Sequence, residues 1–405
     1  MHMSLDTDVI IVGAGPAGLI AARELSQNDI DYIILDRAEK PGENKPCGGF
    51  IPSSTLQKFS IPKIDGQFKI DGVRMKFPGK DLVEISFDEM LGVNIHRREL
   101  AKSLIKSIDG KKQHIRFGTN VARIETNHNG CRIFMKNEGE SSTLTSKLVI
   151  DGSGANPVTL RFIPIRERIP NNRMGYGLQY HIKINRELAH SNTFLYGNRY
   201  SPSGYLWIFP RGNIAVMGTG GLIDRVRASE RRTHEYLDLV LREMEPFKSE
   251  LAGGEIVKKD SALIPLNGIT RPSFGQRILL AGDAAGHCSP ISGEGIHYSM
   301  VGGYHAALTA MKCIRKNDFS DKMLSDYEKK WRGEIGSDLK WGFWLQRKLM
   351  QPRGGGTEGW SSSGFIDSEK SQRIIGEMLM GRRSVLRTIL AVAPSYLMSK
   401  LKKKH

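Results

Sequence analysis

One stretch near the start, residues 8–36, most constrains what this chain can fold into. An apolar run, Val9 to Val12, leads into the turn Gly13-Ala14-Gly15-Pro16-Ala17-Gly18, and an apolar segment continues to about Leu25. A second apolar run follows at 32–35. This order predicts a strand, a glycine turn, a helix and a second strand, the unit that binds the pyrophosphate of a dinucleotide.

The residues of the turn have separate roles in this prediction. Gly13 permits the tight turn, Gly15 lets a phosphate approach the backbone, and Gly18 lets the helix pack closely on the strand. The helix begins at Ala17 and directs its unpaired amides at the anion. Asp36, at the end of the second strand, is placed to accept hydrogen bonds from a ribose hydroxyl. The unit predicts dinucleotide binding and leaves FAD and NAD open.

The charge of the chain bears on its partners. The 405 residues include 59 Lys and Arg against 43 Asp and Glu, a net charge of +16. This surplus favours an anionic partner, such as a membrane surface, an acidic protein or nucleic acid, although a generally basic surface would explain it as well. Because no nucleic-acid recognition motif accompanies the charge, we expect no nucleic-acid partner.

The cysteines and the apolar runs bear on location. Four cysteines lie far apart with no CxxC pair, which argues against a disulfide scaffold, a zinc site or an iron–sulfur cluster. We therefore expect no metal site. The longest uncharged run, 9–22, is too short to span a membrane. We expect a cytoplasmic protein, with peripheral contact at a membrane left open.

The rest of the chain divides by pattern. After a long loop rich in Gly and Pro at 37–50, we expect a helix at 96–104 and strands within 61–90 and at 115–124, 131–136 and 148–150. The region 166–270 is rich in strand patterns, and its clearest segments are strands at 177–184, 205–210 and 214–218 and one helix at 225–244.

The end of the chain is expected to be helical. A helix is predicted at 295–314, and the remainder from 319 to 405 is mostly helical with an interruption at 351–356. The last segment, 384–404, combines apolar residues with Arg and Lys. It fits both a helix lying on an anionic membrane and a last helix packed on the body with a solvated lysine end.

Two more glycine turns follow predicted strands. The first is Asp151-Gly152-Ser153-Gly154, and the second contains Gly282-Asp283. Three such turns in this order, separated by an inserted sheet, resemble the flavoprotein family of the aromatic hydroxylases. The resemblance implies that the dinucleotide is FAD, that Asp283 binds its ribityl chain, and that Pro290 and 293–296 approach the isoalloxazine.

The resemblance also gives the fold class. We predict an α/β chain: a Rossmann-type FAD-binding domain of the aromatic-hydroxylase class, an inserted antiparallel-sheet substrate domain (an α+β insertion) and a C-terminal helical region. The predicted FAD-binding domain is discontinuous, and the prenyl-binding sheet domain is inserted into it. The boundaries are 1–60, 91–165 and 272–318 for the FAD-binding domain, 61–90 and 166–271 for the sheet domain, and 319–405 for the helical region.

Three narrower motifs resemble the geranylgeranyl reductase family. They are Lys45-Pro46-Cys47-Gly48-Gly49, Tyr205-Leu206-Trp207-Ile208-Phe209-Pro210 and Ser289-Pro290-Ile291-Ser292-Gly293-Glu294-Gly295. The resemblance implies FAD-dependent reduction of isolated C=C bonds in geranylgeranyl chains, foremost those of digeranylgeranylglycerol phospholipids in archaeal membrane-lipid biosynthesis. It assigns FAD contacts to Ala17, Asp36, Cys47, Gly48, Arg97, Val121, Asp283, Gly295 and Ile296, next to Gly13, Gly15, Gly18 and Gly282 of the glycine turns. Tyr205, Trp207 and Phe209 would line a prenyl tunnel.

The expected chemistry needs an acid in a dry channel. An isolated alkene is a poor hydride acceptor, so reduced flavin would deliver hydride while an acid protonates the other carbon. Cys47 is the first candidate for that acid or for control of access to the ring, and Tyr205, His297 and bound water also qualify. The reductant is expected to be a ferredoxin or NAD(P)H, and the basic charge suits an acidic ferredoxin and an anionic lipid equally.

Two other functions share these motifs. An FAD monooxygenase or halogenase has the same fold and the same Gly-Asp turn. A non-catalytic prenyl-binding protein, like the escort proteins of prenylated GTPases, reuses the fold, although intact phosphate and ribityl motifs argue against it.

Overall fold

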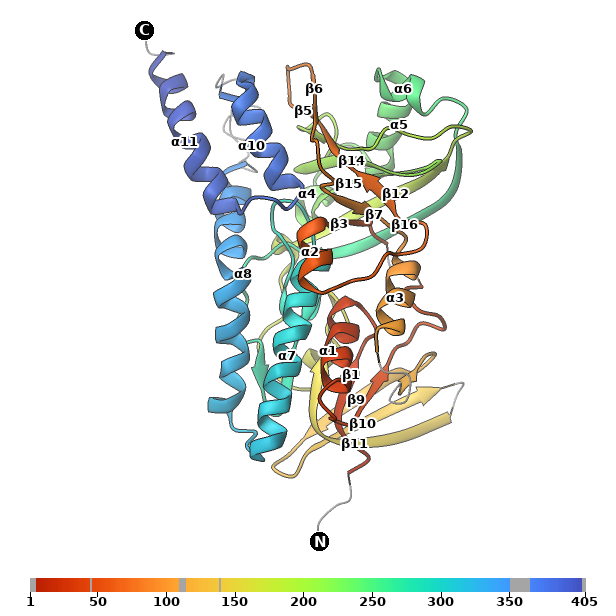
Figure 1. Cartoon of the computed structure of the whole chain (residues 1–405), viewed down its shortest axis with the longest axis vertical. Helices are drawn as coiled ribbons and strands as arrows, with labels where there is room; N and C mark the ends of the chain where they lie inside the picture. Colours follow the sequence, from red (N-terminus) through yellow and green to blue (C-terminus); the bar gives the residue numbers. More distant parts are fainter. Residues whose placement is uncertain (1–4, 44–45, 109–113, 138–139, 350–364, 403–405) are drawn as a thin grey trace.

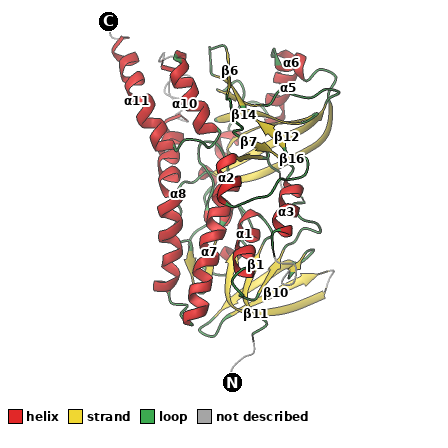
Figure 2. Ribbon diagram, in the orientation of Figure 1, coloured by secondary structure: helices red, strands yellow, loops and turns green. Residues whose placement is uncertain are grey.

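The computed structural model describes residues 5–43, 46–108, 114–137, 140–349 and 365–402. Lys45 of the first reductase motif and the predicted interruption at 351–356 lie outside these residues. One sheet forms the lower end of the molecule in Figure 1 and a second sheet the upper end, with two long helices running along one side. The α/β architecture with C-terminal helices is that predicted from the sequence, as the colouring of Figure 2 makes visible.

The lower sheet is parallel at its centre. Its main path runs β17-β18-β11-β1-β2-β8, and neighbours from β18 to β8 pair in parallel. Helix α1 (Pro16–Ser26) connects β1 to β2 as predicted. The strands of the path are β1 (Thr7–Val12), β2 (Tyr32–Leu35), β8 (Ile115–Arg116), β11 (Glu140–Asp151), β17 (Phe274–Gly275) and β18 (Ile278–Leu280). The carboxyl ends of β1, β2, β11 and β18 therefore meet at one edge, where ligands bind in sheets of this kind.

An antiparallel extension leaves this sheet at β11. It contains β9 (Asn120–Thr126) and β10 (Cys131–Asn137), joined in the order β9-β10-β11. The single strand predicted at 115–124 is wrong, because β8 and β9 pair with different partners. Gly118 has a φ of +66° and makes the turn between them, and the Thr119 N–H donates to the Asp36 carbonyl at 2.9 Å.

The upper sheet has the order β16-β12-β15-β14-β13-β5-β6. All its pairs are antiparallel except β5 with β13. Its strands are β5 (Gly72–Lys76), β6 (Leu82–Ser86), β12 (Met174–Lys183), β13 (Ser191–Tyr196), β14 (Gly204–Arg211), β15 (Ile214–Leu222) and β16 (Glu255–Pro265). The three strands predicted at 177–184, 205–210 and 214–218 are confirmed as β12, β14 and β15. The edge strand β16 was not predicted, because most of its residues are exposed and its polar and apolar residues are mixed.

A small sheet joins the two large ones. It has the order β3-β7-β4, with β3 (Phe50–Pro52), β4 (Phe68–Ile70) and β7 (Gly92–Asn94). Residues 61–90 thus supply β5 and β6 to the upper sheet and β4 to this small one. Helices α2 (Ser53–Lys58) and α3 (Arg97–Lys106) flank it, and α3 is the helix predicted at 96–104.

The helix predicted at 225–244 is wrong as a single element. The structure has α4 (Ile223–Arg227) and α5 (Thr233–Glu243), followed by α6 (Phe247–Glu250). Residues 228–232 contain no large apolar side chain that could hold a continuous helix on the sheet. Glu235 instead starts a new helix, because its carboxylate accepts the Arg232 N–H at 2.8 Å.

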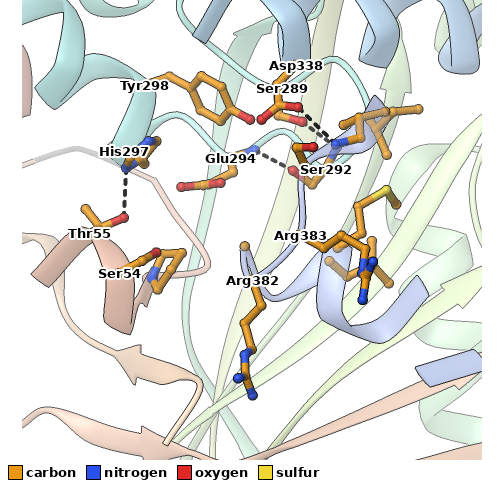
Figure 3. A pocket seen from close by; sticks show the side chains of 17 residues that line it. Ser54, Thr55, Ser289, Ser292, Glu294, His297, Tyr298, Asp338, Arg382 and Arg383 are labelled. Atoms are coloured by element: carbon orange, nitrogen blue, oxygen red, sulfur yellow. Dashed lines mark hydrogen bonds between the residues drawn. The ribbon is translucent and has the colours of Figure 1, made fainter. Parts of the chain in front are cut away.

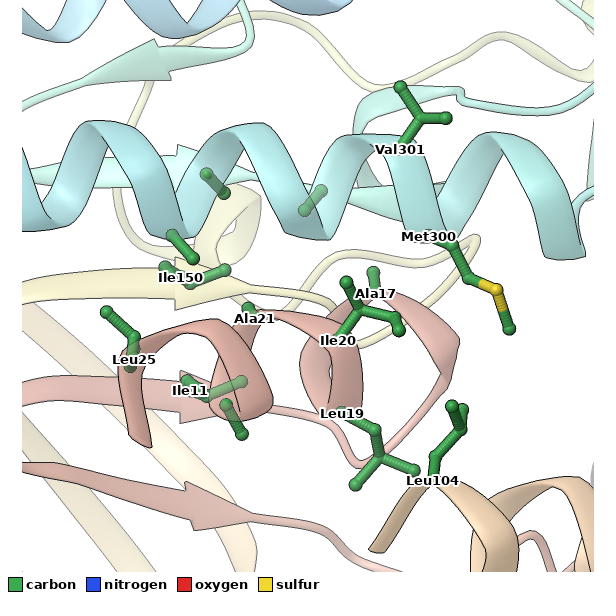
Figure 4. Packing of buried hydrophobic residues seen from close by; sticks show 14 of the residues in the cluster. Ile11, Ala17, Leu19, Ile20, Ala21, Leu25, Leu104, Ile150, Met300 and Val301 are labelled. Atoms are coloured by element: carbon green, nitrogen blue, oxygen red, sulfur yellow. The ribbon is translucent and has the colours of Figure 1, made fainter. Parts of the chain in front are cut away.

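Two helices run the length of the molecule beside the sheets. They are α7 (Ile296–Lys316), close to the helix predicted at 295–314, and α8 (Asp321–Leu349). Helix α7 packs against α1 through small and apolar side chains, with Ala17 of α1 and Met300 of α7 on the facing sides and Val301 on the opposite side of α7 (Figure 4). At Gly303 of α7, an added Cβ would lie 2.0 Å from the Ala17 carbonyl oxygen, so the two helices are in backbone contact there.

The C-terminal helices cover one face of the upper sheet. Helices α10 (Glu369–Leu379) and α11 (Val385–Lys402) contribute Ile374, Leu379 and Val392 to an apolar cluster with strands β5 and β14. Short 3-10 turns complete the described structure, at Thr159–Arg161, Asn171–Arg173, Gly282–Ala285 and Phe365–Asp367. Among the described residues, no helix has the length and apolar character required to cross a membrane.

The α1–α7 contact yields a matched pair of predictions. Gly303→Ala should destabilise the protein by about 2 kcal/mol and weaken FAD retention, because the new methyl group would overlap the Ala17 carbonyl. Gly333→Ala on α8 is the control, since an added Cβ meets no atom within 4 Å. It should stabilise the protein by about 0.5–1 kcal/mol through helix propensity. Denaturant unfolding of both variants checks this, and equal effects would contradict it.

Candidate functional site

The three glycine turns converge at the carboxyl edge of the lower sheet. A Cβ added to Gly13 would lie 2.5 Å from the Gly152 carbonyl oxygen, and one added to Gly282 would lie 3.1 Å from the Ala17 Cβ. Asp151 holds the middle turn, since its carboxylate accepts the N–H groups of Ser153 and Thr159, each at 2.9 Å. Turns far apart in sequence therefore form one backbone cradle.

The first turn presents free backbone donors and an acid. Helix α1 begins at Gly15 without a side-chain cap, so its first amides remain available to an anion. Asp36 is only 3% exposed, and its carboxylate accepts the N–H of Ala14 at 2.6 Å and that of Ala38 at 2.8 Å. The two oxygens keep further lone pairs that suit a ribose hydroxyl.

The third turn leads directly into a second helix start. Gly295 precedes α7, which also lacks a side-chain cap, and a Cβ on Gly295 would lie 3.3 Å from an Asp283 carboxylate oxygen. Ile296 is the buried first residue of α7. Asp283, Gly295 and Ile296, which the resemblance assigned to FAD, are thus adjacent in space.

Two other predicted FAD contacts lie on the side of the first turn. Arg97 is the half-buried first residue of α3, and a Cβ on Gly42 of the long loop would lie 2.5 Å from its carbonyl oxygen. Val121 of β9 is buried in the same apolar cluster as Val12 and Leu35. Arg97 therefore lies against the loop that follows Asp36, and Val121 packs under the end of β2.

The loop carrying Cys47 and Gly48 reaches over to the upper sheet. A Cβ on Gly48 would lie 2.6 Å from the ring of Phe209, and the Cys47 carbonyl accepts a hydrogen bond from the Gln179 side chain at 3.5 Å. Cys47 itself is half-buried against the core of the lower sheet. The loop therefore connects the cradle of glycine turns with the aromatic face of β14.

The predicted tunnel residues alternate along β14 and share one face of the sheet. Tyr205 and Trp207 have ring centroids 5.9 Å apart, and Phe209 meets Phe194 edge to face at 5.3 Å. Trp207 lies over Gly218, where an added Cβ would come within 2.2 Å of the indole. The face is covered by α10 and α11, so these rings form an apolar surface shielded from water.

A polar cluster near the Cys47 loop was not predicted from the sequence. It is formed by the side chains of residues 181, 211 and 260. The Arg211 guanidinium donates to His181 Nδ1 at 2.8 Å, and His181 Nε2 lies 3.3 Å from the Asp260 carboxylate. Hydrogen bonds from His181 and Lys258 hold the pKa of Asp260 well below its usual range despite burial. No pattern in the sequence links these positions, because β12, β14 and β16 bring them together only through cross-strand pairing.

The loop 289–295 lies between the aromatic face and a polar pocket. The Tyr205 hydroxyl donates to the Ser292 carbonyl, and burial raises the pKa of Tyr205 well above its usual value. The pocket lies on the other side of the loop, between α2, α8 and the turn joining α10 to α11, and Ser54, Ser292, Asp338 and Arg382 are among its lining residues. Figure 3 shows Glu294 pointing into this space beside His297.

Glu294 and His297 have unusual protonation in this pocket. Burial raises the pKa of Glu294 to about 7, and the nearby Asp338 carboxylate adds to the rise. Burial lowers the pKa of His297 to about 4, and its Nδ1 lies 2.9 Å from the Thr55 hydroxyl. Glu294 belongs to the third reductase motif, but its raised pKa depends on burial, which the sequence pattern does not indicate.

The backbone and acidic groups of the cradle fit a bound dinucleotide. Two uncapped helix starts, glycines whose Cβ would block the backbone approach, and acids at Asp36 and Asp283 match the pyrophosphate, ribose and ribityl groups of FAD. Among the described residues, no cluster of three or more His, Cys, Asp or Glu side chains is arranged to hold a metal ion.

Comparison with known proteins also indicates FAD binding. A family model described as an FAD binding domain matches residues 6–333. A geranylgeranyl diphosphate reductase of Rhodobacter capsulatus is 30% identical over 326 residues, covering 78% of this chain and 78% of the relative. A digeranylgeranylglycerophospholipid reductase of Methanococcoides burtonii is 26% identical over 342 residues, covering 82% and 81%.

Solved structures share the fold over nearly the whole chain. A geranylgeranyl bacteriochlorophyll reductase-like protein of Thermoplasma acidophilum superposes with a TM-score of 0.83 at 21% identity, covering 98% of each chain. A flavin-dependent halogenase superposes with a TM-score of 0.70 at 18% identity, covering 99% of this chain and 78% of its own. At these identities, both comparisons show the fold alone.

The acid at the end of β2 yields a prediction for cofactor binding. Asp36→Ala should weaken FAD binding about tenfold or more, because a charged acceptor for ribose and two backbone amides is lost. Asp31→Ala removes an exposed acid just before the same strand and should leave FAD affinity unchanged. Fluorescence titration of the apoprotein with FAD measures both affinities. Equal affinities in the two variants would remove Asp36 from the cofactor site.

Proposed function

Because the chain belongs to the FAD-binding family and, within it, to the geranylgeranyl reductases, we propose that it uses FAD to saturate isolated C=C bonds of geranylgeranyl chains. The names of its relatives indicate the substrate class: a geranylgeranyl diphosphate in one case and digeranylgeranylglycerophospholipids in others. We propose the digeranylgeranylglycerol phospholipids of archaeal membrane-lipid biosynthesis as the substrate.

One observation carries this proposal. An apolar aromatic face on β14 lies beside the cradle of glycine turns, and the Cys47 loop connects the two. A prenyl chain has no polar group to recognise, so its site must be apolar along its length, and aromatic walls also exclude water from the reacting carbons. Tyr205, Trp207 and Phe209 are the proposed walls.

The chain's own residues have two tasks in this reaction. Asp36, Asp283 and the amides at the starts of α1 and α7 would hold FAD, which supplies hydride when reduced. Cys47 is the proposed donor of the proton that the second alkene carbon requires, or the group that controls access to the ring. Burial raises the pKa of Tyr205, so its phenol is a weak proton donor. Tyr205 would serve as the donor only if a second group returned a proton to it as it reacts.

The domain division that we propose follows the two large sheets. Residues 1–60, 91–165 and 272–318 form the FAD-binding domain, 61–90 and 166–271 the prenyl-binding domain, and 319–405 the helical region. The last region would close the tunnel, since α10 and α11 pack on the aromatic face.

We also propose the electron donor and a membrane contact from charge. The net charge of +16 suits an acidic ferredoxin, and NAD(P)H is the alternative donor. Leu390 and Met398 of α11 are 64% and 57% exposed beside basic residues, which suits peripheral contact with an anionic membrane. Both contacts involve exposed charges, so both should weaken as salt rises.

The halogenase-like structures make an FAD monooxygenase or halogenase the second candidate function. Such an enzyme would consume oxygen in proportion to NAD(P)H oxidised in the presence of its substrate. A prenyl-binding protein without catalysis would be colourless after purification, whereas the reductase carries a flavin spectrum.

An anaerobic assay tests the proposed function. The holoprotein is reduced with dithionite and mixed with a geranylgeranyl glycerophospholipid, and the mass of the lipid is followed. We expect the lipid to gain two hydrogens for each double bond reduced, because hydride and proton add to each C=C. A flavin spectrum without any mass gain would favour the oxygen-dependent alternative.

The role of Cys47 is tested separately. Cys47→Ala should retain FAD and lose most alkene reduction, on the order of 100-fold, because the proton donor or gate beside the ring is absent. Cys131→Ala is the matched control, since Cys131 is buried in the apolar core at the far side of the lower sheet. Its turnover should match wild type after correction for FAD content. Wild-type turnover in Cys47→Ala would exclude Cys47 from the mechanism.

A further inference from the structure

The loop 289–295 separates an apolar compartment from a polar one. On one side, the Tyr205 hydroxyl donates to the Ser292 carbonyl, and a Cβ on Gly293 would lie 4.0 Å from the same hydroxyl. On the other side, Ser289, Ser292 and Glu294 line the pocket of Figure 3. The backbone of this loop is the partition between the proposed prenyl site and a water-accessible space.

Glu294 is fixed in this partition with its acid group buried. The Glu294 carbonyl accepts the Ser289 N–H at 2.8 Å, and the Glu294 N–H donates to the Ser292 hydroxyl at 3.4 Å. The side chain borders the pocket, but its Oε1 is buried and has no hydrogen-bond partner among the described residues. A buried carboxylate oxygen without a partner is costly, so the neutral acid is favoured, although a hydrogen bond from the His297 backbone opposes this. Burial accordingly raises the pKa of Glu294 to about 7.

Tyr205 and Cys288 connect Glu294 to the proposed reaction site. Each of these two groups interacts electrostatically with both Cys47 and Glu294. Burial raises the pKa of Tyr205 and of Cys288 well above the usual values, so both hold their protons at neutral pH. Two protonated groups therefore lie within electrostatic range of both Glu294 and Cys47, and they donate to the carbonyls of Ser292 and Ser289 in the same loop.

Of the other groups around Glu294, the two neighbours on α7 do not exchange protons near neutrality. From α7, the pKa of His297 is lowered to about 4 and that of Tyr298 is raised well above its usual value. From α8, burial raises the pKa of Asp338, whose carboxylate accepts the Val385 N–H at 2.9 Å. At the turn between α10 and α11, the arginines of the pocket wall are paired with acids, Arg382 with Glu89 and Arg383 with Glu377.

We propose that Glu294 is the proton store of the reductive site and that the polar pocket refills it from solvent. The inference rests on the proposed function, because it assumes that an alkene is reduced beside Cys47. When reduced, FAD would supply the hydride for one alkene carbon, and the other carbon would form a C–H bond with the proton of the proposed donor, Cys47. The Glu294 O–H bond then breaks to restore that donor, and the carboxylate takes a proton from water in the pocket.

Glu294→Gln tests this role by turnover and by spectroscopy. Above pH 7 the wild-type rate should fall, because the protonated acid is the active form and its pKa lies at about 7. Glu294→Gln should be at least about tenfold slower at pH 6, should lose this alkaline decline, and should keep the FAD spectrum. In infrared pH titration of the oxidised holoprotein, wild type should lose a carboxylic C=O band around pH 7 that the variant lacks.

Two further variants keep the test decisive. Glu328→Gln removes another buried glutamate, one that accepts the Ser273 N–H at 2.9 Å far from the loop, and it should keep the wild-type pH profile. If Glu294→Gln does not fold, Glu294→Asp takes its place. It keeps the acid one methylene shorter, so the infrared band should remain and turnover should fall.

The outcomes separate this inference from the proposed function. Wild-type turnover and pH profile in Glu294→Gln, with lipid reduction intact, would overturn the proton store alone. An infrared band unchanged by Glu294→Gln would do the same without reference to activity. Absence of lipid reduction in the wild-type protein would overturn both proposals.

Discussion

The structure depends on close backbone contacts at glycines, where any side chain would clash. Gly13 lies against the Gly152 carbonyl, and Gly303 lies against that of Ala17, so α1 is held between the middle turn and α7. These contacts fix where the amides at the start of α1 point and how far α7 stands from the sheet. The second uncapped helix start, at Gly295, is carried to the same edge by α7. A cofactor with an anionic centre and a long chain of hydroxyls needs both positions set together.

The upper sheet supplies an apolar environment rather than hydrogen-bond donors. Tyr205, Trp207 and Phe209 alternate on β14, and α10 and α11 cover them, so water is largely excluded from that face. In such surroundings an acid without ionic partners is driven to its neutral form. Reduction of an alkene needs this dryness, but it also consumes one proton per turnover. An apolar site that consumes protons therefore needs a nearby space from which water can return them. The loop 289–295 lies between two such compartments.

The sequence predicted the local units and the order of the turns. Glycines at 13, 15 and 18 specify a turn by their own conformational freedom, and the short continuous apolar run at 205–210 predicts a buried strand. The single strand at 115–124 and the single helix at 225–244 were wrong, because a turn at Gly118 and a cap at Glu235 depend on tertiary pairing and local capping that hydrophobic pattern does not record. The predicted site residues and domain boundaries stay predictions, although the three turns that carry many of them meet in space.

What the sequence could not indicate is the protonation of individual groups. Glu294 precedes α7 and Glu334 lies on α8, and burial raises the pKa of the first to about 7, while hydrogen bonds from His305 and Lys58 lower that of the second to about 2. The difference arises from which partners the fold supplies, since Glu334 meets two donors and the Glu294 Oε1 meets none among the described residues. A buried acid with one oxygen left unpartnered beside an apolar site destabilises the fold at alkaline pH. Such a group is retained at a cost to stability, which is the usual property of residues that serve chemistry.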